Sequence, residues 1–284
     1  MTFKARLTDG DVNIPKHSQF GEFVQMIFGL GAIIVFAYIL LGFAVDFVAP
    51  YVPQSMENRL SSAFMKSFNV KGNEKAVKKL QALTDSLSLL TESKRKFRVY
   101  IIPDDQFNAL AAPGGNILVF AGLLKQVKTE NELVFVMAHE MGHFENKDHL
   151  KGLGRGIVLT FISTLFFGSD SAVTNLVTKV MTSASLKFSR DQESAADIFA
   201  AGILEKKYGH TAGAVSMLRK FEPFDSKMPK FFYYFTTHPY YTDRINKVNG
   251  FIVENGFNPG TQKPVDRLYS GIFVRNVKQT APGI

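Results

Sequence analysis

The chain has 284 residues, enough for one sizeable hydrophobic core with appended segments. It contains no cysteine, which excludes disulfide bonds and thiolate metal sites, so a bound metal must be held by histidines and carboxylates. Its net charge is +8, but no nucleic-acid recognition motif accompanies the basic residues between Lys66 and Arg98. We therefore expect no nucleic-acid partner, and a basic face that is solvated or faces anionic lipid.

The N-terminal part of the chain predicts a membrane anchor. Residues 1–22 are polar and predict a loose tail, whereas the 23 residues 23–45 carry no charge and can cross a ~30 Å hydrocarbon layer as one helix. A cleaved signal peptide is the alternative, but Asp46 and Pro50 follow the run where a small-residue cleavage site would be needed. We predict one uncleaved span.

The basic residues around this span indicate its orientation. Lys4, Arg6 and Lys16 precede it, and only Arg59 and Lys66 follow within the next stretch. Cytoplasmic flanks carry the excess of positive charge. We therefore expect a cytoplasmic N-terminus and a folded domain on the other side of the membrane.

The next elements predict a small sheet beside a helical body, an α+β fold. After Pro50 and Pro53, apolar residues recur at helical spacing: Val77, Leu80, Leu83, Leu87 and Leu90. Residues 97–102 alternate and are rich in β-branched and aromatic side chains, which predicts a strand. A Pro-Gly-Gly turn at 113–115 precedes a second predicted strand at 116–120.

The string His139-Glu140-Met141-Gly142-His143 lies on a predicted buried helix, which begins at a capping box formed by Thr129 and Glu132. Residues four apart share one helix face, so both imidazoles can bind one zinc ion. Glu140 is rotated by about 100° from His139, so its carboxylate can reach a zinc-bound water without ligating the metal. This pattern predicts a zinc site in which Glu140 is the general base.

Residues 152–183 leave two alternatives open. The apolar run 156–167 has 12 residues and would reach about 18 Å, too short to cross a bilayer. A second apolar patch at 173–181 follows a polar break at 168–171. We expect a helical pair that either packs on the folded domain or dips into the membrane face.

A third zinc ligand is predicted on a helix over residues 185–207, closed by Gly209. Glu193 and Asp197 share a face there, so Glu193 can ligate the metal while Asp197 accepts the far N–H of a ligand histidine. Alone, this segment would be interpreted as a solvent-facing acidic helix; the upstream histidine pair favours the metal site.

The chain resembles the HtpX and CAAX prenyl protease-type family of membrane-associated zinc metallopeptidases, in the glutamate-zincin clan. The resemblance runs from about Lys75 to Val248. Its marks are NALAAPGG at 108–115, ILVFAGLL at 117–124, HEMGH at 139–143, SRDQESAAD at 189–197 and THPYYTDRI at 237–245. The family is proteolytic, so the resemblance implies a zinc endopeptidase with one Zn²⁺ on His139, His143 and Glu193.

The resemblance also implies a domain plan and a compartment. A mainly helical zincin domain with a small β-sheet would span 55–250, followed by a C-terminal extension over 251–284. Because only one span is predicted, we expect the single-anchor version of the family, in a bacterial inner membrane, where membrane-protein quality control is the fitting role. The oligomeric state stays open.

Two further residues take roles from the resemblance. His238 and Arg244 match a downstream element that is implied to stabilise the oxyanion or orient the site, which a donor aimed at developing negative charge can do. His238 could instead be a fourth zinc ligand, and both could be structural. His17, His149 and His210 match nothing and are expected to be ordinary.

Substrate binding is predicted at the second strand. A protease holds its substrate extended, so we expect an exposed edge strand to pair with it through Asn116, Ile117, Leu118 and Val119. The aromatic cluster 231–235 would line a groove or belong to the core.

Two alternative functions fit the same residues. A non-catalytic zinc scaffold at the membrane is one, although such a site has no need of Glu140 and tends to close its fourth position. A zinc hydrolase of a non-peptide bond is the other, since the metal geometry is the same.

Overall fold

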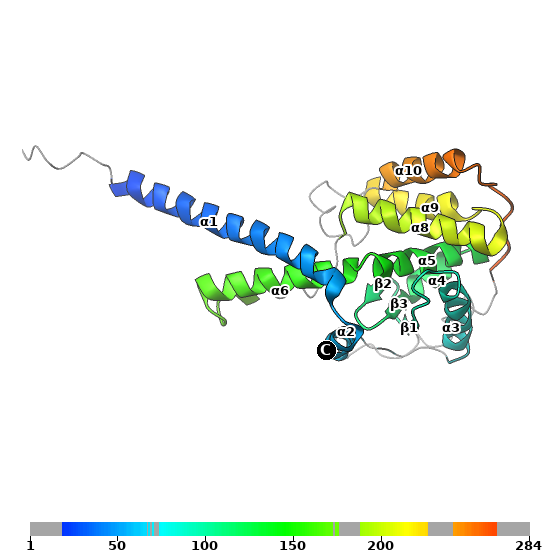
Figure 1. Ribbon diagram of the computed structural model, residues 1–284, viewed down its shortest axis with the longest axis horizontal. Helices are drawn as coiled ribbons and strands as arrows, with labels where there is room; N and C mark the ends of the chain where they lie inside the picture. The colour runs from blue at the N-terminus through cyan, green and yellow to red at the C-terminus, as the bar shows by residue number, and fades with distance from the viewer. Residues whose placement is uncertain are drawn as a thin grey trace, which may run out of the picture.

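The computed structural model describes residues 19–66, 68, 70, 74–172, 174, 175, 188–226 and 241–265. These residues form a mostly helical body with a small three-stranded sheet, from which two long helices project (Figure 1). The predicted α+β fold is confirmed.

The sheet consists of β1 (Arg98–Ile102), β2 (Ala109–Ala112) and β3 (Asn116–Phe120), in the order β1-β3-β2. β3 runs parallel to β1 and antiparallel to β2. The β2–β3 turn requires positive φ at Gly114 (86°) and Gly115 (76°), which only glycine adopts readily.

The prediction that residues 116–119 form an exposed edge strand is wrong. β3 is the central strand, and all five of its residues are buried. Its backbone groups are taken on one side by β1 and on the other by β2, so a substrate cannot add to it. The turn at 113–115 and the apolar residues after it identified the strand, but not its neighbours. β2, built mainly of alanine, was not predicted as a strand.

The two faces of the sheet bury different partners. One face packs in the main core with α3 (Glu74–Ser88) and α5 (Glu130–Glu145), through Val99, Ile101, Ala109, Ala111, Ile117 and Val119. The other face forms a second cluster that includes Phe188 and side chains of α2 (Gln54–Met65). The short α4 (Ala121–Gln126) links β3 to α5.

A helical layer covers α5 on the side away from the sheet. It contains α8 (Arg190–Tyr208), α9 (Ala214–Ser226) and α10 (Tyr241–Glu254) (Figure 1). α8 approaches α5 so closely that a Cβ added at Gly142 would lie 3.0 Å from Cα of Ala196. This close approach brings the HEMGH and SRDQE segments together.

The helix termini follow their capping residues. Thr129 and Glu132 form the predicted capping box of α5, and Gly209 ends α8 in the left-handed conformation as expected. α8 begins at Arg190 rather than at residue 185, because Ser189 and Gln192 form a second capping box that fixes the start of the helix there. Sequence periodicity cannot locate such a start within a few residues.

The described part of the predicted C-terminal extension returns to the body. Pro264 forms an isolated bridge with Thr129, and the backbone N–H of Glu130 donates to the carbonyl of Lys263 at 2.9 Å. Residues 255–265 therefore brace the start of α5.

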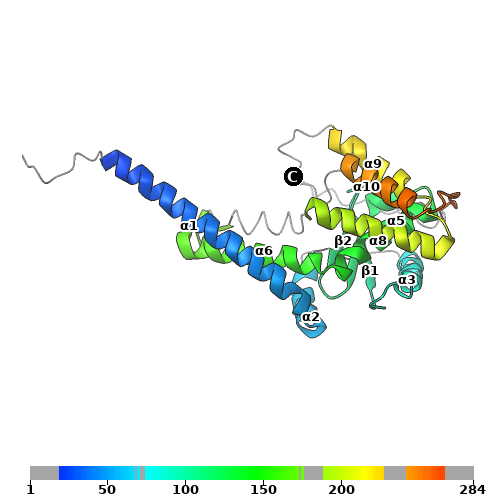
Figure 2. The ribbon, with the colours of Figure 1, turned by 45° about the horizontal axis from the view of Figure 1, so that its top comes forward.

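The two projecting helices are α1 (Gln19–Val48) and α6 (Asp148–Phe167), and they lie side by side in both ribbon views (Figures 1 and 2). Both are long and apolar enough to cross a membrane. Only 6% of the most apolar stretch of α1 and 17% of that of α6 are buried. α1 joins α2 through a 3-10 turn, η1 (Ala49–Tyr51).

α6 has 20 residues, and the apolar run 156–167 forms its second part. The helix begins directly after Lys147, whose left-handed backbone (φ 57°) separates it from α5. Its first turns carry charged residues, so the apolar run indicated only the second part of the helix. Most of the second predicted patch, 173–181, lies outside the described residues.

Candidate metal centre

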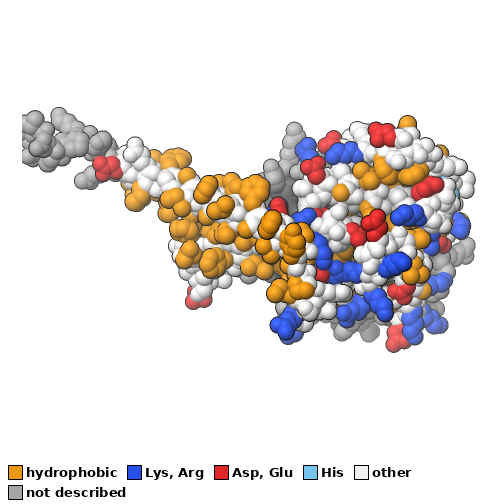
Figure 3. All heavy atoms as spheres, viewed as in Figure 1, with side chains coloured by type: hydrophobic (Ala, Val, Ile, Leu, Met, Phe, Trp, Pro, Cys, Tyr) orange, Lys and Arg blue, Asp and Glu red, His pale blue; other side chains and the backbone are white. Residues whose placement is uncertain are grey.

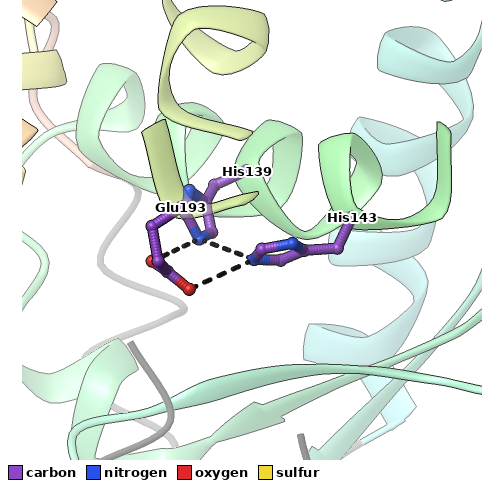
Figure 4. A group of neighbouring side chains, drawn as sticks. All are labelled: His139, His143 and Glu193. Carbon is purple, nitrogen blue, oxygen red and sulfur yellow. Dashed lines mark hydrogen bonds and ion pairs between the residues drawn. The ribbon is translucent and has the colours of Figure 1, made fainter. Parts of the chain in front are cut away.

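Three side chains from two helices meet in the centre of the body (Figure 4). Nε2 of His139 lies 3.6 Å from Oε2 of Glu193, and Nε2 of His143 lies 3.6 Å from Oε1 of the same carboxylate. The two Nε2 atoms are 3.1 Å apart, and one donor atom of each residue lies within 4.8 Å of the others. The structure thus brings together the three predicted ligands.

The environment of His143 favours the neutral imidazole that can bind a metal cation. His143 is completely buried and stacks on Phe188, with ring centroids 3.7 Å apart. Burial lowers the pKa of His143, and its hydrogen bond to Asp148 opposes this effect only in part. A neutral imidazole is the form that binds a metal, so the site favours the competent state near neutral pH.

Asp197 and Arg244 are in direct contact with this group. Oδ1 of Asp197 lies 2.8 Å from Nδ1 of His139, as expected for a carboxylate that orients this ring. Arg244 donates from Nε and Nη2 to Asp197 at 2.6 and 2.7 Å, and its Nη1 lies 2.7 Å from Oε2 of Glu193. Arg244, from α10, therefore fixes the carboxylates of Glu193 and Asp197 on α8.

The Asp197 carboxyl is held ionised. Burial by itself raises its pKa, but the charge and hydrogen bonds of Arg244, together with His139, outweigh burial and keep the pKa below its usual value. An ionised Asp197 accepts the N–H of His139 and so directs the Nε2 lone pair of that ring toward the metal position.

A second orienting carboxylate, Asp148, was not predicted from the sequence. Its Oδ2 lies 3.1 Å from Nδ1 of His143, and its Oδ1 accepts from Nε2 of Gln192 at 2.8 Å and from Lys151 at 3.2 Å. The left-handed turn at Lys147 brings this residue back beside the helix it has just left. An acidic residue five positions after His143 was the available signal, but spacing alone did not predict the turn.

Glu140 borders a small cavity at the site. The cavity has a volume of about 20 Å³ and its described lining includes Glu140, His139, Ala109, Phe135 and Arg244. Such a volume has room for about one water molecule. Glu140 is 2% exposed, so its carboxylate lies within the body next to a ligand histidine.

His149 was expected to be ordinary, but it belongs to a buried polar cluster behind the site. Its Nε2 lies 2.9 Å from Oε1 of Glu57, a carboxylate on α2 that also accepts from Arg95 and from the backbone N–H of Gly114. Burial by itself raises the pKa of Glu57, but the hydrogen bonds from His149 and Arg95 lower it to about 2. This cluster ties α2 to the α5–α6 junction.

The other predicted residues are not among the described side chains of the site. His238, His17 and the aromatic cluster 231–235 are outside the described residues. His210 stacks on Tyr208, away from the site. The β2 strand, not β3, borders the cavity, since Asn108 and Ala109 belong to its lining.

The donor set fits a zinc ion. Two imidazole nitrogens and one carboxylate oxygen are the three protein ligands typical of catalytic zinc, which keeps a fourth position for water or substrate. Each histidine has a carboxylate on its other ring nitrogen, the usual support of a metal ligand. The group can therefore bind a metal without rearrangement of its supports.

Comparison with known proteins agrees with this site. The chain is 24% identical to the mitochondrial metalloendopeptidase OMA1 of Schizosaccharomyces pombe over 165 residues, which cover 57% of this chain and 48% of that protein. It is 25% identical to metalloprotease YcaL of Escherichia coli over 157 residues, 54% of this chain and 60% of that protein. It is 40% identical to the beta-barrel assembly-enhancing protease of Yersinia pestis over 47 residues, 16% of this chain and 10% of that protein.

The chain thus covers less than two thirds of the length of each of these relatives. The sequence model of peptidase family M48 matches residues 74–252, which include all three candidate ligands. Because this match covers more than half of the chain, the chain belongs to peptidase family M48, a family of metal-dependent peptidases.

Proposed function

We propose that this protein is a membrane-anchored zinc endopeptidase of the HtpX type, with Zn²⁺ held by His139, His143 and Glu193. The observation that carries the proposal is the convergence of these three side chains from α5 and α8, beside the buried carboxylate of Glu140. Membership of family M48 and relatives named as metalloproteases support the same reaction class.

A zinc ion held by His139, His143 and Glu193 would supply Lewis-acid polarisation of the scissile carbonyl and would lower the pKa of a water molecule. Glu140 accepts a proton from the attacking water and delivers it to the leaving amine. Asp197 and Asp148 hold the ligand histidines in the right tautomer, and Arg244 fixes the carboxylates of Glu193 and Asp197. We also propose that His238 stabilises the oxyanion. The contacts of Arg244 favour an orienting role for that residue.

We further propose that α1 anchors the enzyme in a bilayer, with a cytoplasmic N-terminus, and that its substrates are membrane or envelope proteins. Large apolar side chains cover α1 and are exposed, among them Phe28 (76%), Phe36 (68%) and Phe43 (70%). Relatives named for action in mitochondria and in β-barrel assembly support a role in the quality control of such proteins.

The test compares Glu140→Gln with Glu145→Gln, a matched change at the partly exposed end of the same helix. Both full-length variants, purified in detergent, should bind one zinc per chain. Glu140→Gln should lose casein hydrolysis by about 10²–10⁴-fold, because the general base is gone, whereas Glu145→Gln should keep it.

Metal content is measured by mass spectrometry and hydrolysis with labelled casein. Equal activity of wild type and Glu140→Gln would contradict the role of Glu140. The wild type is also tested on a panel of peptide, ester and lipid substrates. If it bound zinc but cleaved only esters or lipids, the reaction would be another zinc-dependent hydrolysis and not peptide hydrolysis.

A further inference from the structure

α6 carries an apolar stripe that the catalytic body leaves uncovered. Ile157, Phe161 and Leu165 lie four residues apart on one helix face and are 55%, 61% and 68% exposed. Phe166 and Phe167 at the end of the helix are also exposed. An apolar patch of this kind on a folded protein marks a surface that contacts a partner or a membrane.

The stripe is continuous with the apolar surface of α1. The two helices cross so closely that a Cβ added at Gly154 would lie 2.6 Å from Cγ1 of Val45, and Arg155 pairs with Asp46 just beyond the crossing. In Figure 3 hydrophobic side chains cover both helices where they run together, whereas charged side chains are spread over the body. The Arg155–Asp46 pair therefore lies close to the boundary between the charged and the apolar parts of the molecule.

α6 is neither a core helix nor a signal sequence, the two other kinds of long apolar helix. Only 17% of its most apolar stretch is buried, which excludes a place in the core. It lies within the matched peptidase region, far from the N-terminus, where a signal sequence does not occur. A bilayer around α1 would surround α6 as well, because the helices are in contact.

Several polar groups of the described turn at the end of α6 have partners within the turn or on α6. The carbonyl of Gly168 accepts from Oγ1 of Thr174, whose own N–H donates to Oγ of Ser171. Thr174 also packs back on α6 through Ser163 at 3.0 Å. Non-helical backbone within a membrane requires such internal partners. The carboxylate of Asp170 at this turn opposes insertion, whereas five large apolar side chains favour it.

We propose that α6 and the turn after it form a re-entrant element that enters the same bilayer as α1 and reaches about halfway across it. The 12 residues from Gly156 to Phe167 extend about 18 Å, against a hydrocarbon layer of about 30 Å. Asp148, which holds His143, precedes Arg155 by seven residues, or about 10 Å of helix. The metal site is thereby held close to the membrane surface. This inference rests on the proposed anchoring by α1.

The chain contains no cysteine, so single cysteines introduced into the full-length protein can carry one fluorophore each. We suggest Ile157→Cys, Phe161→Cys and Leu165→Cys on α6, Phe36→Cys on α1, and Leu89→Cys as a control on the body, where the leucine is 72% exposed. The Glu140→Gln background prevents self-cleavage. Each protein is reconstituted in phosphatidylcholine–phosphatidylglycerol vesicles that contain lipids with a quencher at a shallow or a deep position.

Labels at Phe161 and Leu165 should lose fluorescence about twofold, as the label at Phe36 does, while the label at Leu89 is unaffected. The shallow quencher should act best at Ile157 and the deep quencher best at Leu165. Equal depth at all three positions would overturn insertion in favour of a helix lying on the surface. Quenching at Phe36 but not on α6 would overturn it as well, and disulfide-linked dimers of Phe161→Cys would then assign the stripe to a second copy.

The readout needs no catalysis, so it separates this inference from the proposed chemistry. Absence of quenching at Phe36 would overturn both the anchor and the insertion of α6, and would leave zinc binding and peptide hydrolysis to be judged by the Glu140 variants.

Discussion

His139 and His143, the candidate ligand histidines, each have their own carboxylate, and the two carboxylates are held differently. Asp197 takes part in a buried ion pair with Arg244, while Asp148 pairs with Lys151 and accepts a hydrogen bond from the amide of Gln192. Gln192 also completes the capping box of α8 with Ser189. The same side chain therefore fixes the start of this helix and supports the candidate metal site. Orientation of His143 therefore depends on α5, α6 and α8 together.

At this scale we predict the effect of removing Asp148. In Asp148→Ala, the affinity for Zn²⁺ should fall by about 10–100-fold, because the ring of His143 loses its partner. Asp148→Asn, which can still accept a hydrogen bond, should fall between this variant and the wild type. Zinc affinity is measured by competition with a chelator, and the visible spectrum of the Co²⁺ form reports the geometry.

Asp191→Ala is the control, since the Asp191 side chain is 98% exposed on α8 near the site. If Asp148→Ala bound Zn²⁺ as tightly as this control and its Co²⁺ spectrum were unchanged, Asp148 would have only a structural role.

The closest approach of α5 and α8 is the element-scale feature that makes the site. Gly142 directly precedes the candidate ligand His143, and its missing side chain allows contact with Ala196 on α8. Alanines on α8 at 196, 200 and 201 are fully buried, so the interface is made of small residues. Helix pairs of this kind approach closely because no large side chain separates their backbones.

Two glycine substitutions should therefore have opposite effects. Gly142→Ala should lower stability by about 1–3 kcal/mol through overpacking and should weaken zinc binding by moving the helices apart. Gly202→Ala, on α8 with open space around its Cβ position, should raise stability by about 0.5–1 kcal/mol because alanine favours the helix. Thermal unfolding in detergent measures both; equal shifts would contradict a tight crossing at Gly142.

For the whole molecule, the Glu57 cluster connects the segment after α1 to the rest of the body. Glu57 lies on α2, which follows the apolar helix α1, and is 0% exposed; it contacts His149 at the α5–α6 junction and Arg95 before β1. A charged carboxylate in this position is stable only because its partners surround it. The part of the body next to α1 and the part that holds the candidate metal site are thereby joined at one ionised group.

This cluster predicts a pH dependence of stability. The folded-state pKa of Glu57, about 2, is lower than its ordinary value of 4.5, so its contribution is present above about pH 5 and is lost as the pH falls toward 2. Glu57→Gln should lower the unfolding temperature at pH 7, and the gap to wild type should narrow by pH 3. Glu74→Gln, at a side chain that is 89% exposed, is the control. A gap that stays constant from pH 7 to pH 3 would contradict the assignment.

Much of the candidate site was predictable because its signals are local. His139 and His143 share a face of any helix that contains them, and capping residues such as Thr129 and Ser189 act within one turn. Glu193 and Asp197 were found by the same reasoning, since their spacing fixes their common face. Their approach to the histidines was an expectation until two helices far apart in sequence were seen to cross.

The sequence by itself determined α3, β1, β3 and α5, the long apolar run near the N-terminus and the identity of the candidate ligands, because helical periodicity, strand composition and capping depend on neighbouring residues. Only the tertiary structure decided that β3 is central rather than an edge, that Asp148 supports His143, and that α6 lies along α1. These three outcomes depend on which distant surfaces bury one another. A periodic pattern shows that a face will be covered, but not by which partner.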